Sequence, residues 1–257
     1  MIDYHTHSIL SDGKNCYEEM ISTAIDKGLE EIGFSDHLCL KPVSWAISRI
    51  DLPVMTEKIL ELREKYSDRI KIRYGIEMDY FPGREEELRE LINLLPLDYV
   101  IGSIHFIGDW NFDTDKSLYG KWTNDKLYTM YFELVMEAAR SGLFDIIGHI
   151  DIIKKFRVYP ESDQSQLIET TLKTIKENNV AVELNTSGID RPCADFMPGP
   201  AIVKRCYHHQ IPMTISSDAH KTDHVARYFE SAVDLLKETG FKELASFENR
   251  KMKMFRI

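Results

Sequence analysis

Long apolar segments and paired cysteine motifs are both missing from this chain. No run approaches eighteen consecutive apolar residues, and the N-terminus lacks the basic region, apolar core and cleavage site of a signal peptide. We therefore expect neither a membrane span nor secretion. The cysteines show no CxxC spacing, which disfavours a disulfide framework, so we expect reduced thiols in a cytoplasmic protein. The four are Cys16, Cys39, Cys193 and Cys206.

Basic residues are fewer than acidic residues in this chain. The 32 Lys and Arg stand against 42 Asp and Glu, giving a formal net charge of −10. This balance disfavours a nucleic-acid polymer as partner, because a phosphate backbone requires a basic face. A small anionic substrate is still compatible with it, since a bound metal ion reverses the field locally. With 257 residues, 43% hydrophobic composition and no low-complexity linker, we expect a single domain over residues 1–257.

Apolar, β-branched runs alternate with segments of helical periodicity along the whole chain. This alternation is typical of repeated β-α units around a parallel sheet, and we count seven such units. The predicted fold is therefore an α/β barrel. The strands are expected at Ile2–His5, Glu31–Ser35, Ile70–Glu77, Asp98–His105, Phe144–His149, Val180–Asn185 and Ile211–Ser216.

Helical periodicity is clearest between Leu127 and Ala138, where apolar residues recur on one face and Gly142 follows as a C-terminal cap. Another helix is expected to begin at Asn15, as an N-cap paired with Glu18.

Two polar and aromatic segments are longer than a tight β-α connection requires. They are Ile107–Trp122 and Lys41–Asp51. We expect both to form walls of a pocket.

Residue types that bind metals follow almost every predicted strand. The carboxyl ends of all strands in a parallel barrel open onto one face, so these residues are expected to converge. A single histidine at a strand end is more often a hydrogen-bonded core residue than a ligand. Here, however, six of the nine histidines fall at this mouth, beside three carboxylates. The candidate ligands are His5, His7, Asp12, His37, Glu77, His105, His149, Asp218 and His220.

The pair His5 and His7 has the spacing that places two imidazoles on the same side of an extended strand. Nine candidates exceed the coordination number of one ion, so we expect two or three divalent metals. Mixed imidazole and carboxylate ligation favours Zn, Fe or Mn, and the absence of cysteine ligands argues against a structural zinc. The remaining histidines, His208, His209 and His224, are interpreted as solvated or structural.

These residues lie in motifs that resemble the polymerase-and-histidinol-phosphatase (PHP) superfamily, and within it the histidinol-phosphate phosphatases. The resemblance spans essentially the whole chain and implies a distorted, TIM-like (β/α)7 barrel with a trinuclear metal site. The shared motifs are, in order, DYHTHS with SDG, FSDH, GIEMDY, DYVIGSIHF with a downstream W-x-F-D, GHIDIIKKF, ELNTSG and SSDAH.

The resemblance also implies how the ligands divide among the ions. One ion would be held by His5, His7, Glu77 and Asp218. Glu77 would bridge to a second ion held by His105 and His149. The third would be held by Asp12, His37 and His220.

The implied reaction is hydrolysis of L-histidinol phosphate to L-histidinol and phosphate in histidine biosynthesis. We expect a metal-bound hydroxide to attack phosphorus, without a protein nucleophile. The residues expected to carry catalysis are His5, His7, Glu77, Asp218 and His220.

Substrate contacts outside the metals are expected from basic residues after the fifth and sixth strands. Arg191 is preferred for the phosphate because its planar fork matches phosphate oxygens, and Lys155 is the second choice, together with Lys154 and Arg157. Asn185, Ser187 and Ser217 are expected to orient ligands. The ammonium and imidazole of the leaving group could contact Asp79, Asp109, Asp113, Asp115, Trp110 or Phe112.

Two other functions fit the same motifs. A PHP phosphoesterase acting on nucleotides or other small phosphate esters would use the same metals. A noncatalytic metal-binding module would bind metal without turnover. The native metal, the number of ions and the oligomeric state are left open by the sequence.

Overall fold

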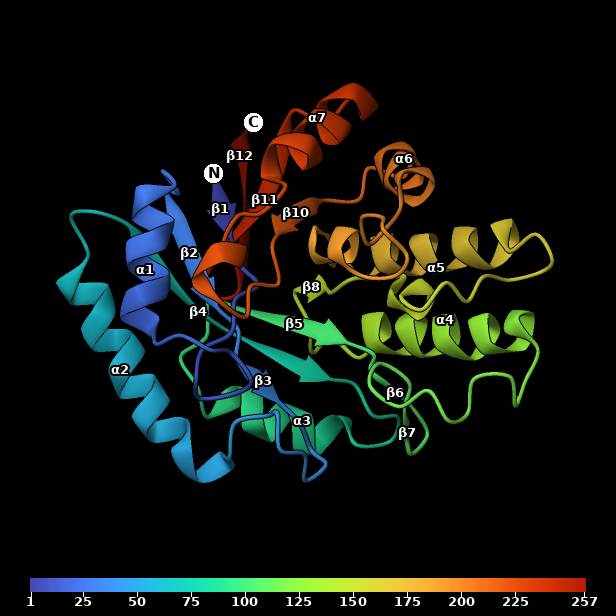
Figure 1. The fold of residues 1–257 in the computed structure, drawn as a ribbon, viewed down its shortest axis with the longest axis horizontal. Helices are drawn as coiled ribbons and strands as arrows, with labels where there is room; N and C mark the ends of the chain where they lie inside the picture. The colour runs from blue at the N-terminus through green and yellow to red at the C-terminus, as the bar shows by residue number, and fades with distance from the viewer.

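Parallel strands form the centre of the molecule, and helices surround them (Figure 1). The computed structural model describes residues 1–257. Seven parallel strands follow one another around a nearly closed barrel, and the short β3 (His37–Leu38) pairs with β4 beside them. The barrel strands are β1 (Ile2–Asp3), β2 (Glu31–Phe34), β4 (Lys71–Asp79), β5 (Tyr99–Ser103), β8 (Ile146–Ile147), β9 (Ala181–Asn185) and β10 (Met213–Ser216).

All seven predicted strands are confirmed, although most are shorter than predicted. The barrel closes between its first and last strands without a regular ladder. A single bridge joins Thr6 to Ala219, whose N–H donates to the carbonyl of His5 at 3.0 Å. Asp3 adds a second link by accepting a hydrogen bond from the backbone N–H of Ser217 at 3.0 Å. The closure therefore brings the candidate ligands His5 and His7 next to Asp218 and His220.

The helices lie outside the barrel, with α1 and α2 on one side of the strands and α4 and α5 on the other (Figure 1). None is long and apolar enough to cross a bilayer. The helices are α1 (Tyr17–Asp26), α2 (Leu52–Lys65), α3 (Glu85–Asn93), α4 (Asn124–Arg140), α5 (Ser165–Glu177), α6 (Pro200–His208) and α7 (Phe229–Thr239).

The predicted helix over 127–138 is confirmed within α4, which buries Leu127 and Ala138, and Gly142 follows with a φ of +66°. The predicted start of α1 is wrong by one residue. Cys16 is the N-cap, and its N–H donates to the carboxylate of Glu19 at 2.9 Å. Glu19 rather than Glu18 reaches this position because it lies three residues into the helix.

Aromatic side chains fill the barrel toward the amino end of its strands. Tyr99 stacks on Tyr4 with ring centroids 4.9 Å apart and donates a hydrogen bond to its carbonyl at 2.6 Å. Gly33 and Gly75 make room for the Tyr99 side chain, because a Cβ would lie 2.2 Å from its hydroxyl at Gly33 and 2.2 Å from its ring at Gly75. Phe247 packs against Tyr4 from below. Space for a polar site is therefore left only at the carboxyl end of the strands.

The structure contains two antiparallel hairpins that the sequence pattern did not predict. One consists of β6 (Phe106–Ile107) and β7 (Trp110–Asn111), inside the long loop expected after the fourth strand. The other consists of β11 (Glu243–Glu248) and β12 (Lys251–Arg256), and it covers the amino end of the barrel next to the N-terminus (Figure 1).

Candidate metal centre

The nine candidate ligands form one cluster at the carboxyl end of the barrel. Seven of them are buried, whereas Asp12 and His220 reach solvent. Eight supply atoms to three groups in which all ligand atoms lie within 4.8 Å of one another, and His105 lies beside them. The groups are His7 with Asp12, His37 and His220; His5 with Glu77 and His149; and His5 with His7 and Asp218.

Glu77 lies at the centre of the cluster. Its Oε2 is 2.9 Å from His5 Nε2 and 2.9 Å from His37 Nδ1. Its Oε1 is 3.0 Å from His149 Nε2 and 3.7 Å from His105 Nε2. The two carboxylate oxygens thus face different sets of imidazoles, which is the arrangement that a bridging ligand requires.

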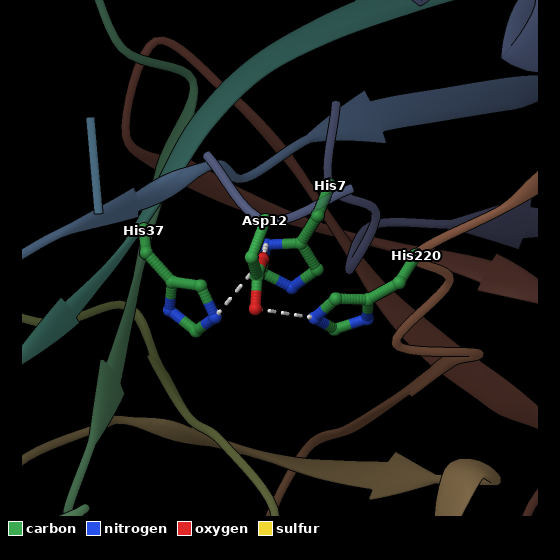
Figure 2. A group of neighbouring side chains, drawn as sticks. All are labelled: His7, Asp12, His37 and His220. Carbon is green, nitrogen blue, oxygen red and sulfur yellow. Dashed lines mark ion pairs between the residues drawn. The ribbon is translucent and has the colours of Figure 1, made fainter. Parts of the chain in front are cut away.

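Asp12 occupies the outer part of the cluster, where its carboxylate lies between three imidazoles (Figure 2). Its Oδ2 is 3.2 Å from His220 Nε2, and its Oδ1 is 3.7 Å from His37 Nε2 and 4.0 Å from His7 Nδ1. Because Asp12 comes from the loop after the first strand, this group joins residues from three distant parts of the chain.

Asp218 connects the inner and outer parts. Its Oδ1 is 3.4 Å from both His7 Nε2 and His220 Nδ1, and 3.9 Å from His5 Nε2. Its backbone adopts a φ of +51°, a left-handed conformation that is uncommon for residues other than glycine. His7 consequently contacts the groups of both Asp12 and Asp218, whereas the resemblance had assigned it to one ion.

The chemistry of these donors fits divalent ions. His5 Nε2, His149 Nδ1 and both ring nitrogens of His7 are buried without a hydrogen-bond partner, although polar atoms in protein interiors are normally paired. Burial, together with the neighbouring imidazoles of His220 and His37, lowers the pKa of His7 to about 4, so that it is neutral at pH 7. Burial opposes ionisation of Glu77 and Asp218, but surrounding histidines hold both pKa values well below their ordinary range. Neutral imidazoles and ionised carboxylates are the forms that bind metals.

Two further buried carboxylates contact the ring nitrogens that point away from the cluster. Asp79 Oδ1 lies 3.0 Å from His105 Nδ1, and Glu183 Oε1 lies 2.6 Å from His5 Nδ1. The sequence reasoning considered Asp79 only for the leaving group and missed Glu183. The signal for Glu183 is its place in β9, where alternate residues face the barrel interior and a carboxylate interrupts an apolar strand.

Of the residues expected to orient ligands, two contact Asp218. Ser187 Oγ donates to its Oδ2 at 3.0 Å, and Asn185 Nδ2 donates to the same oxygen at 3.5 Å. Ser217 does not contact a candidate ligand, since its hydroxyl donates to Asp3 at the barrel closure.

A cavity of about 760 Å³ opens above the cluster. Arg191 and Lys155 both line it, and the guanidinium of Arg191 makes no ion pair, whereas Lys155 Nζ lies 2.6 Å from Asp113 Oδ1. Lys154 does not line the cavity because its ammonium is buried in ion pairs with two aspartates. Arg157 donates instead to a backbone carbonyl, so neither of these two fits the predicted phosphate contact.

The cavity is also lined by an acidic and an aromatic side chain. Asp113 lines the cavity, and its Oδ2 accepts no hydrogen bond within the chain. Trp45, from the segment 41–51, also lines the cavity and meets His37 edge-on at 4.7 Å between centroids. Both segments expected as pocket walls therefore contribute to the cavity. The other candidates for the leaving group do not line it: Asp79, Asp109, Asp115, Trp110 and Phe112.

His224 also lines this cavity, although the sequence pattern placed it outside the site. It lies in a short 3-10 helix, Thr222–His224, after the last barrel strand. Burial and the neighbouring cations Arg227 and Lys221 together lower its pKa to about 4, so the ring is neutral at pH 7.

The fold and the cluster together define a class of protein: a (β/α)7 barrel with a histidine and carboxylate metal centre at the carboxyl ends of its strands. Comparison with known proteins identifies the family within this class. The PHP domain model matches residues 3–187, and the chain belongs to the PHP domain family.

Relatives match over nearly the full length. A Deinococcus radiodurans protein named "Probable histidinol-phosphatase" is 32% identical over 98% of this chain and 98% of its own. The histidinol-phosphatase of Bacillus subtilis is 26% identical over 90% of this chain and 98% of its own. The crystal structure of a histidinol phosphate phosphatase from Lactococcus lactis, complexed with zinc, L-histidinol and phosphate, superposes with a TM-score of 0.85 at 26% identity, covering 98% of both chains.

Proposed function

We propose that this chain is a divalent-metal-dependent phosphatase that hydrolyses L-histidinol phosphate to L-histidinol and phosphate. The observation that carries the proposal is the match over 98% of both chains to an enzyme crystallised with zinc, L-histidinol and phosphate. The clustering of nine metal-binding side chains below an open cavity supports it. All of residues 1–257 would form one phosphoesterase domain, because the ligands come from both the first and the last barrel strands.

Two or three divalent ions, of Zn, Fe or Mn, would be held by the nine clustered residues. Bound ions supply Lewis acidity toward the phosphoryl oxygens and neutralise charge that develops on the leaving oxygen. Glu77 is the residue placed to bridge between ions, since its two oxygens face different imidazoles. The catalytic set proposed here is His5, His7, Glu77, Asp218 and His220.

The remaining contacts come from other residues that line the cavity. Arg191, whose guanidinium has no carboxylate partner in the chain, would donate to the phosphoryl oxygens. Asp113 would accept a hydrogen bond from the substrate ammonium through Oδ2, and Trp45 would pack against the imidazole. Lys155 would contribute positive charge near phosphate while remaining paired with Asp113. The substrate would thus lie across the cavity with its anionic end at Arg191.

The proposal is tested by measuring phosphate release from L-histidinol phosphate beside a nucleoside monophosphate and a dinucleotide. The protein is purified without added metal, and its metals are quantified by elemental analysis. We expect the highest kcat/KM for L-histidinol phosphate and at least two divalent ions per chain. A higher kcat/KM for the nucleotides would identify a nucleotide phosphoesterase, and bound metal without any release would identify a noncatalytic module.

A further inference from the structure

Glu183 is a buried carboxylate that no step of the proposed reaction uses. It projects from β9 into the barrel beneath the metal-binding cluster and has no exposed surface. No lysine or arginine pairs with it. Burying a carboxylate is unfavourable unless hydrogen bonds replace its lost hydration. The four donors around Glu183 therefore explain how the charge is tolerated there.

These donors come from four strand ends. Oε1 accepts from His5 Nδ1 at 2.6 Å and from the hydroxyl of Ser216. Oε2 accepts from the backbone N–H of His149 at 2.7 Å and from Asn185 Nδ2 at 3.1 Å. One carboxylate thus contacts two candidate ligands, which precede it in the chain by 178 and 34 residues.

The bond to His5 decides which ring nitrogen is available. A carboxylate accepts a proton but does not donate one, so the neutral imidazole carries its hydrogen on Nδ1 when this bond is made. The lone pair is then left on Nε2, which faces Glu77 Oε2 at 2.9 Å outside hydrogen-bonding geometry. The bond to His149 acts differently, because it holds the backbone from which that side chain reaches Glu77.

We propose that Glu183 is a positioning residue for the metal centre, which sets the tautomer and orientation of His5 and anchors the backbone of His149. This inference rests on the proposed role of the nine residues as metal ligands. Outer-sphere partners of this kind change metal affinity without touching the ion. The competing explanation is that Glu183 only joins strands and contributes to stability.

The variant Glu183→Gln distinguishes the two explanations, because it keeps the size of the side chain but replaces one acceptor by an amide donor. Asp98→Asn is the matched control. Asp98 is also buried and accepts from the backbone N–H groups of Tyr74 at 2.9 Å and Asn249 at 3.0 Å, and it pairs with Arg63, all at the amino end of the barrel. It makes no hydrogen bond to any candidate ligand.

Zinc is titrated into metal-stripped protein in competition with a chromophoric chelator, and thermal unfolding of the stripped protein is measured in parallel. We expect Glu183→Gln to weaken zinc binding by about 10- to 100-fold. Asp98→Asn is expected to lower the unfolding temperature while zinc affinity stays at the wild-type value.

Wild-type zinc affinity in Glu183→Gln would overturn the inference, and so would an equal loss of affinity in both variants. If Glu183→Gln does not fold, Glu183→Asp is used, since the shorter carboxylate keeps the charge but cannot reach both histidines. Weakened zinc binding by this variant supports the inference, and unchanged binding overturns it. Failure of the wild-type chain to bind zinc would instead refute the metal centre itself.

Discussion

Replacing Asp113 by Asn is expected to separate recognition of the leaving group from the metal chemistry. The carboxylate lines the cavity with Oδ1 held by Lys155 at 2.6 Å, while Oδ2 accepts no hydrogen bond in the chain. Asn has the same shape, so the substitution removes the charge without opening space. The substrate ammonium then loses a charged acceptor.

The size of the effect follows from that single contact. A hydrogen bond to a charged group contributes about 1.5–3 kcal/mol. Because about 1.4 kcal/mol corresponds to a factor of ten, kcat/KM for L-histidinol phosphate should fall roughly 10- to 100-fold. The analogue without the amine, 3-(imidazol-4-yl)propyl phosphate, makes no such contact, so its kcat/KM should stay unchanged.

The assay measures phosphate release from both substrates, with the zinc content of each variant as a reference. Asp109→Asn is the matched control, because Asp109 lies in the same loop but is exposed and pairs with Lys41 outside the cavity. An equal loss of kcat/KM with both substrates would show that Asp113 acts through Lys155 or the metals. Unchanged kcat/KM for L-histidinol phosphate would show that the ammonium does not contact Asp113.

Three further substitutions test other parts of the molecule. Glu77→Ala removes the carboxylate that faces both sets of imidazoles, so turnover and stoichiometric zinc should both be lost; full activity with normal zinc would contradict its role. Arg191→Ala should raise KM by roughly 10-fold or more, given about 1.5–3 kcal/mol for a charged hydrogen bond, and an unchanged KM would exclude Arg191 from the site. Glu31→Gln breaks a largely buried pair with Arg73 (2.7 Å) and should lower the free energy of unfolding by about 2–4 kcal/mol at pH 7. Burial raises the pKa of Glu31, but hydrogen bonds from Arg73 and Tyr4 outweigh burial and hold the folded-state pKa below that of an unpaired glutamate. The contribution of the pair is therefore present above the pKa of the unfolded chain and lost as the pH falls through the folded pKa. Urea unfolding at neutral and acidic pH measures the difference between wild type and variant, and a difference independent of pH would contradict this assignment.

The barrel and its mouth could be predicted because both follow from local patterns. Alternation of apolar strands with amphipathic helices marks seven units, and parallel strands have a fixed direction, so residues after each strand share one face. This is why His5 and His220 could be expected in one cluster although most of the chain separates them. The C-terminal hairpin was not predicted, because its short strands resemble exposed polar segments until they cover the barrel floor.

Partnerships between individual side chains could not be predicted in the same way. Lys154 and Lys155 are adjacent in sequence, but the first is buried between two aspartates and the second lines the cavity. Likewise Asp79 and Asp113 are both acidic residues near strand ends, yet Asp79 binds His105 and Asp113 faces the substrate space. Such differences depend on which groups lie opposite after packing.

The sequence by itself determined the number of β-α units, the direction of the strands and the residue types at their carboxyl ends. These are properties of short segments, set by the periodicity of side chains along a strand or helix. The tertiary structure alone decided that Glu183 supports His5, that Arg191 keeps a free guanidinium and that Trp45 closes one wall. Each of these depends on the distance and burial of groups far apart in the chain, which only the closed barrel defines.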